Sequence, residues 1–306
     1  MLTAADNACE RVVVVGAINI DLLATAHSAV IADDSTPGVL LQSPGGVGRN
    51  VAENIARLGV NTSLVSSVGD DDFGRQMITH CTDAGIDTRL VNVNADFPTA
   101  SYTAIHGRDG ELLHAISDMR IFDEFSLVQN KRAEQAISGA NVVVIDANLP
   151  ESVITGMARH YTDQSIVADT VSCKKCKRLH AILPYLTLLQ TNRAEAIELT
   201  GSANASDNEL IQALLRLGPR QVLLTKGCEG AVLASAQGKV CALPVDDIQV
   251  ISTAGAGDAV FGGVIAAKVY GCSDEEQLRW GMLAASQTLQ VASACAEGLH
   301  VDLMKK

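Results

Sequence analysis

The chain has 306 residues, of which 47% are hydrophobic and 19% charged, a balance typical of globular and not of disordered proteins. The formal net charge is −12, and because no basic stripe offsets it, the sequence excludes nucleic acid as an expected partner. No uncharged apolar run approaches the ~20 residues of a membrane span, and residues 1–11 lack the pattern of a secretory leader, so we expect a cytoplasmic protein without membrane contact.

Short apolar runs alternate along the chain with segments of helical spacing. The first run, residues 11–16, is rich in valine, as expected for a strand buried on both faces of a parallel sheet. Similar runs predict strands at 62–68, 140–146, 165–169, 186–190 and 221–225. Helical spacing or a high alanine content predicts helices near 47–58, 210–217, 256–270 and 274–291. The alternation indicates one α/β domain over residues 1–306, a three-layer αβα fold with a mostly parallel central sheet.

Two segments interrupt this alternation. Residues 22–42 mix polar and β-forming side chains, and residues 99–116 are interpreted as two strands joined by a turn at Arg108-Asp109-Gly110. We expect these two segments to form a small β lid that projects from the main body.

The strongest functional signal is the run Ser252-Thr-Ala-Gly-Ala-Gly-Asp258, which an apolar, helix-like stretch follows at once. Small residues let the backbone N–H groups of 254–257 converge at a helix start, where unpaired donors and the helix dipole attract an anion. Asp258 would lie beside that anion, where a carboxylate can accept the proton of an attacking hydroxyl. The alternative is a glycine-rich helix cap in which Asp258 only complements the dipole.

The second signal is the run Pro44-Gly-Gly-Val-Gly-Arg-Asn50, which leads into the first predicted helix. Glycines let a ligand approach the backbone closely, and the Asn50 amide can both donate to and accept from a sugar hydroxyl. A tight strand-to-helix turn would explain the same glycines, so this run alone decides nothing.

Together the two runs resemble the motifs of the ribokinase family, also called the PfkB family of carbohydrate kinases. That family has a Gly-Gly motif in its N-terminal half and a Gly-Ala-Gly-Asp motif near its C-terminus, and here the two stand in that order, about two hundred residues apart. The resemblance covers nearly the whole chain. It implies a ribokinase-like fold, ATP and Mg²⁺ as cofactors and a small sugar or nucleoside substrate. It also implies that Asp258 is the catalytic base and that Gly255, Ala256 and Gly257 form the anion site.

The resemblance assigns further residues to the two substrates. Those implied for the sugar hydroxyls are Asn19, Asp21, Gly45, Gly46 and Asn50. Those implied for the nucleotide are Asn192, Glu195, Thr225, Gly227, Gly230, Ala254, Gly255 and Gly257. Glu195 would act on magnesium through water, so no direct metal ligand is expected. Taken alone, the Asn192 pattern is also that of an ordinary helix N-cap, and residues 225–231 that of a plain β-turn.

Four windows, residues 45–59, 99–102, 115–119 and 169–172, narrow the resemblance to the pseudouridine kinases within this family. This implies phosphorylation of the 5′-hydroxyl of pseudouridine, with Ser101 and Asp118 contacting the ligand from the lid and Asn148 at the pocket floor. For Asp118 the alternative is a solvated carboxylate at the end of a hairpin. A kinase for another nucleoside or sugar, such as ribose, fructose or adenosine, and a non-catalytic ligand-binding protein remain alternative functions.

Three features bear on cofactors and partners. Ser252 stands where many family members have an Asp linked to a monovalent-cation site, so a requirement for K⁺ stays open. Relatives often pair two subunits through the lid, which implies a homodimer. Cys173-Lys-Lys-Cys176 lacks the second cysteine pair of a zinc site, so we interpret it as a solvated basic face and the eight cysteines as reduced thiols.

Overall fold

The structure, a computed structural model, describes residues 11–128 and 130–305. Residues 1–10, on which the expectation about a leader falls, lie outside this part. Within the described residues, one sheet has nine strands in the order β13-β12-β11-β10-β9-β8-β1-β4-β5. Its strands are β1 (Arg11–Val15), β4 (Asn61–Gly69), β5 (Val91–Asn94), β8 (Val142–Asp146), β9 (Ser165–Asp169), β10 (Leu188–Asn192), β11 (Gln221–Thr225), β12 (Ala231–Ser235) and β13 (Val240–Leu243).

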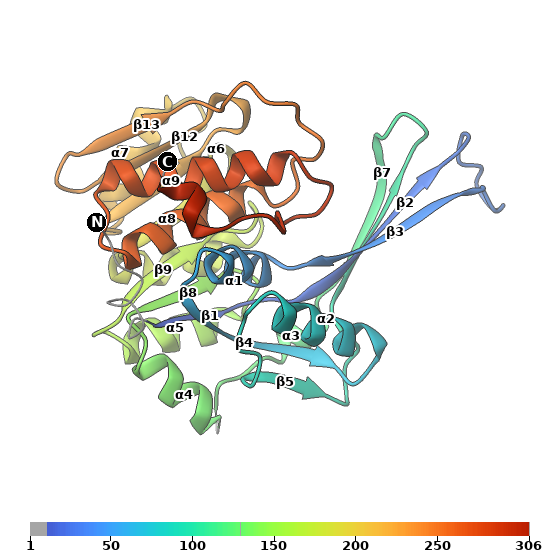
Figure 1. Cartoon of the computed structure of the whole chain (residues 1–306), viewed down its shortest axis with the longest axis horizontal. Helices are drawn as coiled ribbons and strands as arrows, with labels where there is room; N and C mark the ends of the chain where they lie inside the picture. The colour runs from blue at the N-terminus through green and yellow to red at the C-terminus, as the bar shows by residue number, and fades with distance from the viewer. Residues whose placement is uncertain (1–10, 129, 306) are drawn as a thin grey trace.

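Helices cover both faces of this sheet (Figure 1). One face carries α1 (Val47–Arg57), α2 (Asp72–Asp83), α8 (Ala256–Val269), α9 (Asp274–Leu289) and α10 (Val301–Met304). The other carries α3 (Arg120–Asp123), α4 (Lys131–Ser138), α5 (Glu151–His160), the 3₁₀ helix η1 (Cys176–Tyr185), α6 (Arg193–Thr200) and α7 (Asp207–Arg216). A short 3₁₀ turn, η2 (Gly227–Glu229), follows β11.

The central strand β1 shows why the sheet lies between two helix layers. Val13 and Val15 pack into the core on one face, whereas Val12 and Val14 pack into the core on the other, and all four are fully buried. Because side chains alternate along a strand, a run of valines is stable only where both faces are covered. The predicted three-layer αβα fold is therefore confirmed, and every apolar run predicted to be a strand overlaps one.

Three strands of the large sheet were not predicted. β5 and β13 have four residues each and lie at the two edges, and β12 pairs antiparallel with both β11 and β13. Short edge strands bury few side chains, so their sequences carry little of the apolar pattern on which the other assignments depend.

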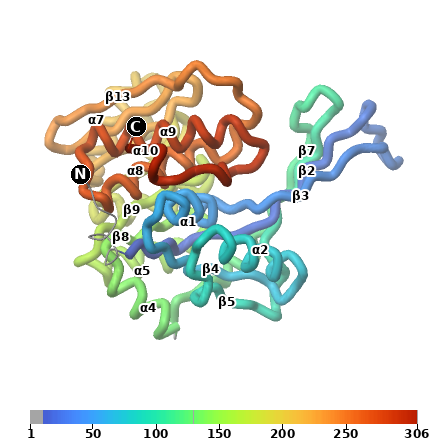
Figure 2. Tube along the Cα trace, viewed as in Figure 1, coloured from blue at the N-terminus to red at the C-terminus, as the bar shows by residue number. Residues whose placement is uncertain are grey.

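A second sheet, here called the projecting sheet, has the strand order β3-β2-β6-β7 and extends away from the main body (Figures 1 and 2). It consists of β2 (Asn19–Ala26), β3 (Gly38–Gly45), β6 (Ser101–His106) and β7 (Leu112–Asp118). The small sheet was predicted, but its first two strands reach further into the body than residues 22–42. Asn19 and Asp21, which the resemblance assigns to the sugar hydroxyls, both lie on β2, because β1 ends at Val15.

None of the helices within residues 11–128 and 130–305 combines the length and apolar character needed to cross a membrane.

Candidate active site

A cavity of about 460 Å³ lies where the carboxyl ends of β9, β10 and β11 face the start of α8. In open α/β sheets, ligands bind in the crevice outside the carboxyl ends of the strands. The lining of this cavity combines the carboxyl groups of Asp169, Glu195 and Asp258 with apolar side chains such as Met282 and Leu289. The cavity therefore suits a ligand with one charged and one flat apolar part.

The start of α8 is open to an anion. Gly255 is its N-cap, with a left-handed φ of 73°. The N–H of Ala254 donates to Ser252 Oγ at 3.2 Å, and the N–H of Ala256 reaches Thr253 O at 3.4 Å. The N–H groups of Gly255, Gly257 and Asp258 donate to none of the described residues. Unpaired donors at a helix N-terminus form a site for phosphate. We call residues 254–258 the anion cradle.

Asp258 lies in the first turn of α8, with its side chain on the cavity. Asn50 Nδ2 donates to Asp258 Oδ2 at 2.7 Å, which joins α1 to α8. Burial raises the pKa of Asp258 to about 7, with the charges of Asp146 and Asp21 adding to the effect and Asn50 and Arg49 opposing it. A carboxylate with a pKa near neutrality can take up a proton under the conditions in which it also exists as the free base.

Asn50 itself has an unused acceptor. Its side chain is 6% exposed, and the buried Oδ1 has no hydrogen-bond partner among the described residues. Buried amide oxygens are nearly always paired, so an unpaired one beside Asp258 suits a hydroxyl group of a ligand.

The predicted sugar-binding residues of β2 and β3 lie together at the root of the projecting sheet. Asn19 Nδ2 donates to Asp21 Oδ1 at 2.6 Å, and Asn19 stands opposite Gly45 in the β2–β3 register. A Cβ at Gly45 would lie 2.5 Å from Asp21 Oδ1, so only glycine allows this close approach. Burial raises the pKa of Asp21, while Asn19 and Arg49 oppose that shift. Gly46, the next residue, is the N-cap of α1.

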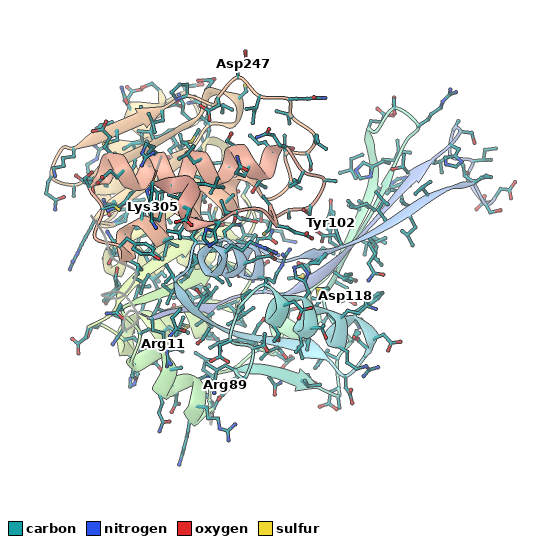
Figure 3. The ribbon with its side chains drawn as sticks, in the orientation of Figure 1. Arg11, Arg89, Tyr102, Asp118, Asp247 and Lys305 are labelled. Carbon is teal, nitrogen blue, oxygen red and sulfur yellow. The ribbon has the colours of Figure 1, made fainter. Side chains whose placement is uncertain are left out.

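Ser101 and Asp118 face each other on β6 and β7, and Ser101 also stands opposite Ile20 of β2. Figure 3 shows Asp118 and Tyr102 where the projecting sheet joins the body. Both carboxylate oxygens of Asp118 accept from Arg120, at 2.9 and 2.7 Å, and these hydrogen bonds lower the pKa of Asp118. This arrangement favours the alternative interpretation of Asp118 as a solvated carboxylate.

Asn148 is 5% exposed and lies after β8, but it has an unpredicted partner. Lys175 Nζ donates to Asn148 Oδ1 at 2.5 Å, and burial lowers the pKa of Lys175. The interpretation of residues 173–176 as a solvated basic face is wrong for Lys175 and for Cys176, which is fully buried. Charge alone could not reveal this, because nothing near Lys175 in the sequence points to Asn148.

The cavity brings together most of the residues predicted for the nucleotide. Its lining includes Asn192, Glu195, Thr225, Gly227, Gly230 and Gly257, whereas Ala254 and Gly255 precede α8 outside that lining. Asn192 and Glu195 form a reciprocal capping box at the start of α6. Thr170 Oγ1 donates to Glu195 Oε2 at 2.5 Å. Asn192 and Glu195 therefore cap the start of α6 and also line the cavity.

Two buried carboxylates were missed. Asp146 Oδ2 accepts the N–H groups of Ala17 and Gly48, both at 2.8 Å, and so joins the end of β1 to the start of α1. Asp169 lines the cavity, and burial together with the charge of Asp258 raises the pKa of Asp169 well above its usual range. Each is the last residue of a predicted strand, a position from which the general placement of ligands at strand ends would have identified it.

The carboxylates that line the cavity fit a Mg²⁺ ion that binds together with the phosphates of a substrate. Asp169, Glu195 and Asp258 line one cavity, but in the described part of the chain no group of three or more His, Cys, Asp or Glu residues could hold a metal on its own. Mg²⁺ usually keeps several waters and binds through one or two carboxylates and the phosphates of a substrate.

Comparison with known proteins points to one family. The profile described as pfkB family carbohydrate kinase matches residues 10–300. The pseudouridine kinase of Escherichia coli is 29% identical over 283 residues, which cover 92% of this chain and 90% of that protein. The ribokinase of Bacillus subtilis is 26% identical, with 94% and 95% covered. The structure of Arabidopsis thaliana ribokinase complexed with ribose and ATP has a TM-score of 0.89 at 23% identity, covering 97% and 98% of the two chains.

Proposed function

The chain belongs to the pfkB family of carbohydrate kinases, and from this premise we propose that it transfers the γ-phosphoryl group of ATP to the 5′-hydroxyl of pseudouridine. Its general activity is that of a sugar or nucleoside kinase, a phosphotransferase with an alcohol acceptor. The observation that carries phosphoryl transfer is the anion cradle, which ends in Asp258, a residue whose carboxyl pKa burial raises to about 7.

The proposed reaction is an in-line displacement. Asp258 accepts the proton of the 5′-hydroxyl, the hydroxyl oxygen bonds to the γ-phosphorus, and the bond to the β-phosphate oxygen breaks to release ADP. The free N–H groups of Gly255, Gly257 and Asp258 stabilise the charge on the transferring group. Bound Mg²⁺ neutralises charge on the nucleotide phosphates.

The nucleotide is placed in the cavity of about 460 Å³. Its base lies against the apolar side chains of Met282, Ala285 and Leu289, and its phosphates extend towards Thr225 and Gly227. Glu195 would hold the magnesium ion through a water molecule. Ser252 Oγ already accepts the N–H of Ala254 at 3.2 Å, and a requirement for K⁺ forms no part of this proposal.

The acceptor is placed on the other side of Asp258. Asn19, Asp21 and the unpaired Oδ1 of Asn50 supply polar atoms for ribose hydroxyls. The Asn148–Lys175 pair supplies donors for the carbonyl oxygens of a uracil ring. The similarity to a pseudouridine kinase over 92% of this chain supports this choice of nucleoside. The projecting sheet acts as a lid that excludes water from the reacting groups.

A panel of acceptors at fixed ATP tests the substrate. Pseudouridine has a free ring N–H that uridine lacks, and a site that hydrogen-bonds such a group discriminates strongly against the analogue without it. We expect kcat/KM for pseudouridine to exceed that for uridine, ribose, fructose and adenosine by about 10²-fold or more. A better rate with another acceptor would assign the chain to that acceptor. If ADP formed with none of these acceptors, the result would favour a non-catalytic ligand-binding protein.

We further propose a homodimer formed through the projecting sheet. Leu40, Leu41 and Ile116 are 63%, 62% and 73% exposed, and they lie on β3 and β7, the two edge strands of the projecting sheet. Light scattering is expected to give twice the chain mass of 32.1 kDa. The Ile116→Lys variant should shift the mass towards a monomer, whereas the matched Val240→Lys, at an exposed residue of β13, should not. A wild-type mass equal to one chain would disprove the dimer.

A further inference from the structure

Arg49 is a cation inside the protein that the reaction above does not use. It lies in the first turn of α1, and its side chain is 2% exposed. The guanidinium donates to Pro44 O at 2.6 Å and to Gly45 O at 3.3 Å. It also donates to Glu53 Oε2 at 2.6 Å. One side chain thus joins the last two residues of β3 to the next turn of α1.

Glu53 is held in turn by two other groups. Arg57 Nε lies 2.8 Å from Glu53 Oε1, and His80 Nε2 lies 2.9 Å from Glu53 Oε2. Burial acts to raise the pKa of Glu53, but the contacts with His80, Arg49 and Arg57 lower it to about 2. The carboxylate is therefore ionised throughout the neutral range and keeps the guanidinium of Arg49 in a fixed orientation.

The buried ion pair of Arg49 and Glu53 is not expected to contribute much to the stability of the fold. Desolvating two charges can outweigh their attraction, and apolar side chains of similar volume often replace a buried ion pair without loss of stability. An apolar side chain could not, however, donate to two backbone carbonyls at once. The planar guanidinium fits this role because it presents five donors in a fixed geometry.

The bonded carbonyls belong to the part of the chain that carries the acceptor site. Gly45 stands opposite Asn19 on β2, and Pro44 stands opposite Ile20. The residue after Arg49 is Asn50, which donates to Asp258. Residues 44–50, which we call the β3–α1 corner, therefore fix the distance between the predicted sugar-binding residues and the predicted base.

The same corner contacts the segment behind the anion cradle. Cys295 Sγ lies 3.6 Å from Asn50 O and 3.7 Å from Arg49 Nη1. The neighbouring Ala294 packs so closely on Gly255 that a Cβ there would lie 2.0 Å from Ala294 O. Figure 2 shows the C-terminal part of the tube, in red, passing beside α1, in blue. The corner and the cradle thus rest on consecutive residues.

We propose that Arg49 and Glu53 are positioning residues, which hold the β3–α1 corner so that the acceptor hydroxyl lies in line between Asp258 and the transferring phosphoryl group. The inference rests on the proposed kinase activity. It assigns to this buried pair the alignment of the acceptor and no part in holding the nucleotide, because neither Arg49 nor Glu53 lines the nucleotide cavity.

The test uses Arg49→Lys and Glu53→Gln, with the best acceptor of the panel. Lysine keeps the charge but cannot donate to both carbonyls and to Glu53 in the same geometry. We expect kcat/KM for the acceptor to fall by about 10²-fold, as small misplacements of reacting groups do, with the KM for ATP nearly unchanged. Arg75→Lys, which alters an exposed ion pair on α2 with Arg75 61% exposed, is the matched control and should behave as wild type.

A double-mutant cycle separates positioning from general support of the fold. If Arg49 acts through the corner that carries Asn50, the loss in Arg49→Lys/Asn50→Ala is smaller than the product of the two single losses. Three results would overturn the proposal. The loss in the double variant could equal the product of the two single losses, or the KM for ATP could rise as much as kcat/KM for the acceptor falls. The third is wild-type kinetics in both Arg49→Lys and Glu53→Gln. Should Arg49→Lys fail to fold, the cycle is run with Glu53→Gln. An inactive wild-type protein would instead refute the kinase activity itself.

Discussion

The Asp258→Asn variant is expected to lose about 10²–10⁴-fold in kcat, the range that a positioned general base contributes. The amide has nearly the same shape as the carboxylate but cannot accept the proton of the acceptor hydroxyl. The anion cradle stays in place, because its donors are backbone N–H groups at the start of α8. Affinity for ATP, measured by calorimetry, should therefore remain close to that of wild type. Initial rates of ADP formation at saturating substrates measure the loss.

Stability is the control for this variant. The pKa of the Asp258 carboxyl is raised from 3.8 to about 7 by folding, so the folded protein binds the proton more tightly than the unfolded chain does. The stability contributed by this group is thus complete at a pH below 3.8 and is lost as the pH rises through about 7. The amide introduced by Asp258→Asn has no charge to desolvate, so this variant should resist urea at least as well as wild type at pH 8.

The pH profile of wild type checks the same assignment. A base must be deprotonated to act, so kcat should fall by about tenfold for each pH unit below about 7. The exposed Asp302, replaced by Asn, serves as the matched control and should change neither rate nor profile. A kcat of Asp258→Asn within tenfold of wild type, or a flat profile between pH 5 and 8, would refute Asp258 as the base.

Local patterns were enough to predict the main strands and the helix that begins at the small residues 254–257. The valines of β1 can be stable only between two covered faces, and residues 254–258 combine small side chains with a helix start, so each assignment depends on adjacent residues. The projecting sheet was also visible as two stretches that break the α/β alternation. The exact extent of this sheet could not be predicted. Residues 19–21 form the start of β2 only because they pair with β3, which lies more than twenty residues later in the chain.

Contacts between distant parts of the chain could not be predicted in this way. The hydrogen bond from Asn50 to Asp258 joins residues 208 positions apart, and Lys175 reaches Asn148 across 27 positions. Arg49 looks like any surface arginine of an amphipathic helix until its carbonyl partners are known. Residue type restricts which groups can bind a ligand, but the fold decides which of them are buried together.

The site therefore combines a local element with assembled ones. The cradle is encoded in a few consecutive residues, whereas the acceptor side depends on β2, β3, α1 and the Ala294–Cys295 segment meeting at one place. A substitution in the cradle should accordingly affect the transferring phosphoryl group directly. A substitution in the β3–α1 corner should act first on the acceptor.

The Gly255→Ala variant is expected to lose about 10²–10³-fold in kcat/KM, the range found when donors to a developing negative charge are removed. The φ of Gly255 is 73°, and an added Cβ would lie 2.0 Å from the backbone oxygen of Ala294. Backbone cannot yield as a flexible side chain can, so the start of α8 must shift and its free N–H groups with it. Rates of ADP formation over a range of ATP concentrations measure the loss.

Gly271→Ala separates this displacement from simple backbone strain. Gly271 has a φ of 72°, almost that of Gly255, but a Cβ there would have no atom within 4 Å. Both variants should therefore lose about 1–2 kcal/mol of stability from the left-handed conformation alone. Only Gly255→Ala should lose activity as well, because only there does the new methyl group move the donors that face the phosphoryl group. Equal activity in the two variants would show that the cradle does not stabilise phosphoryl transfer.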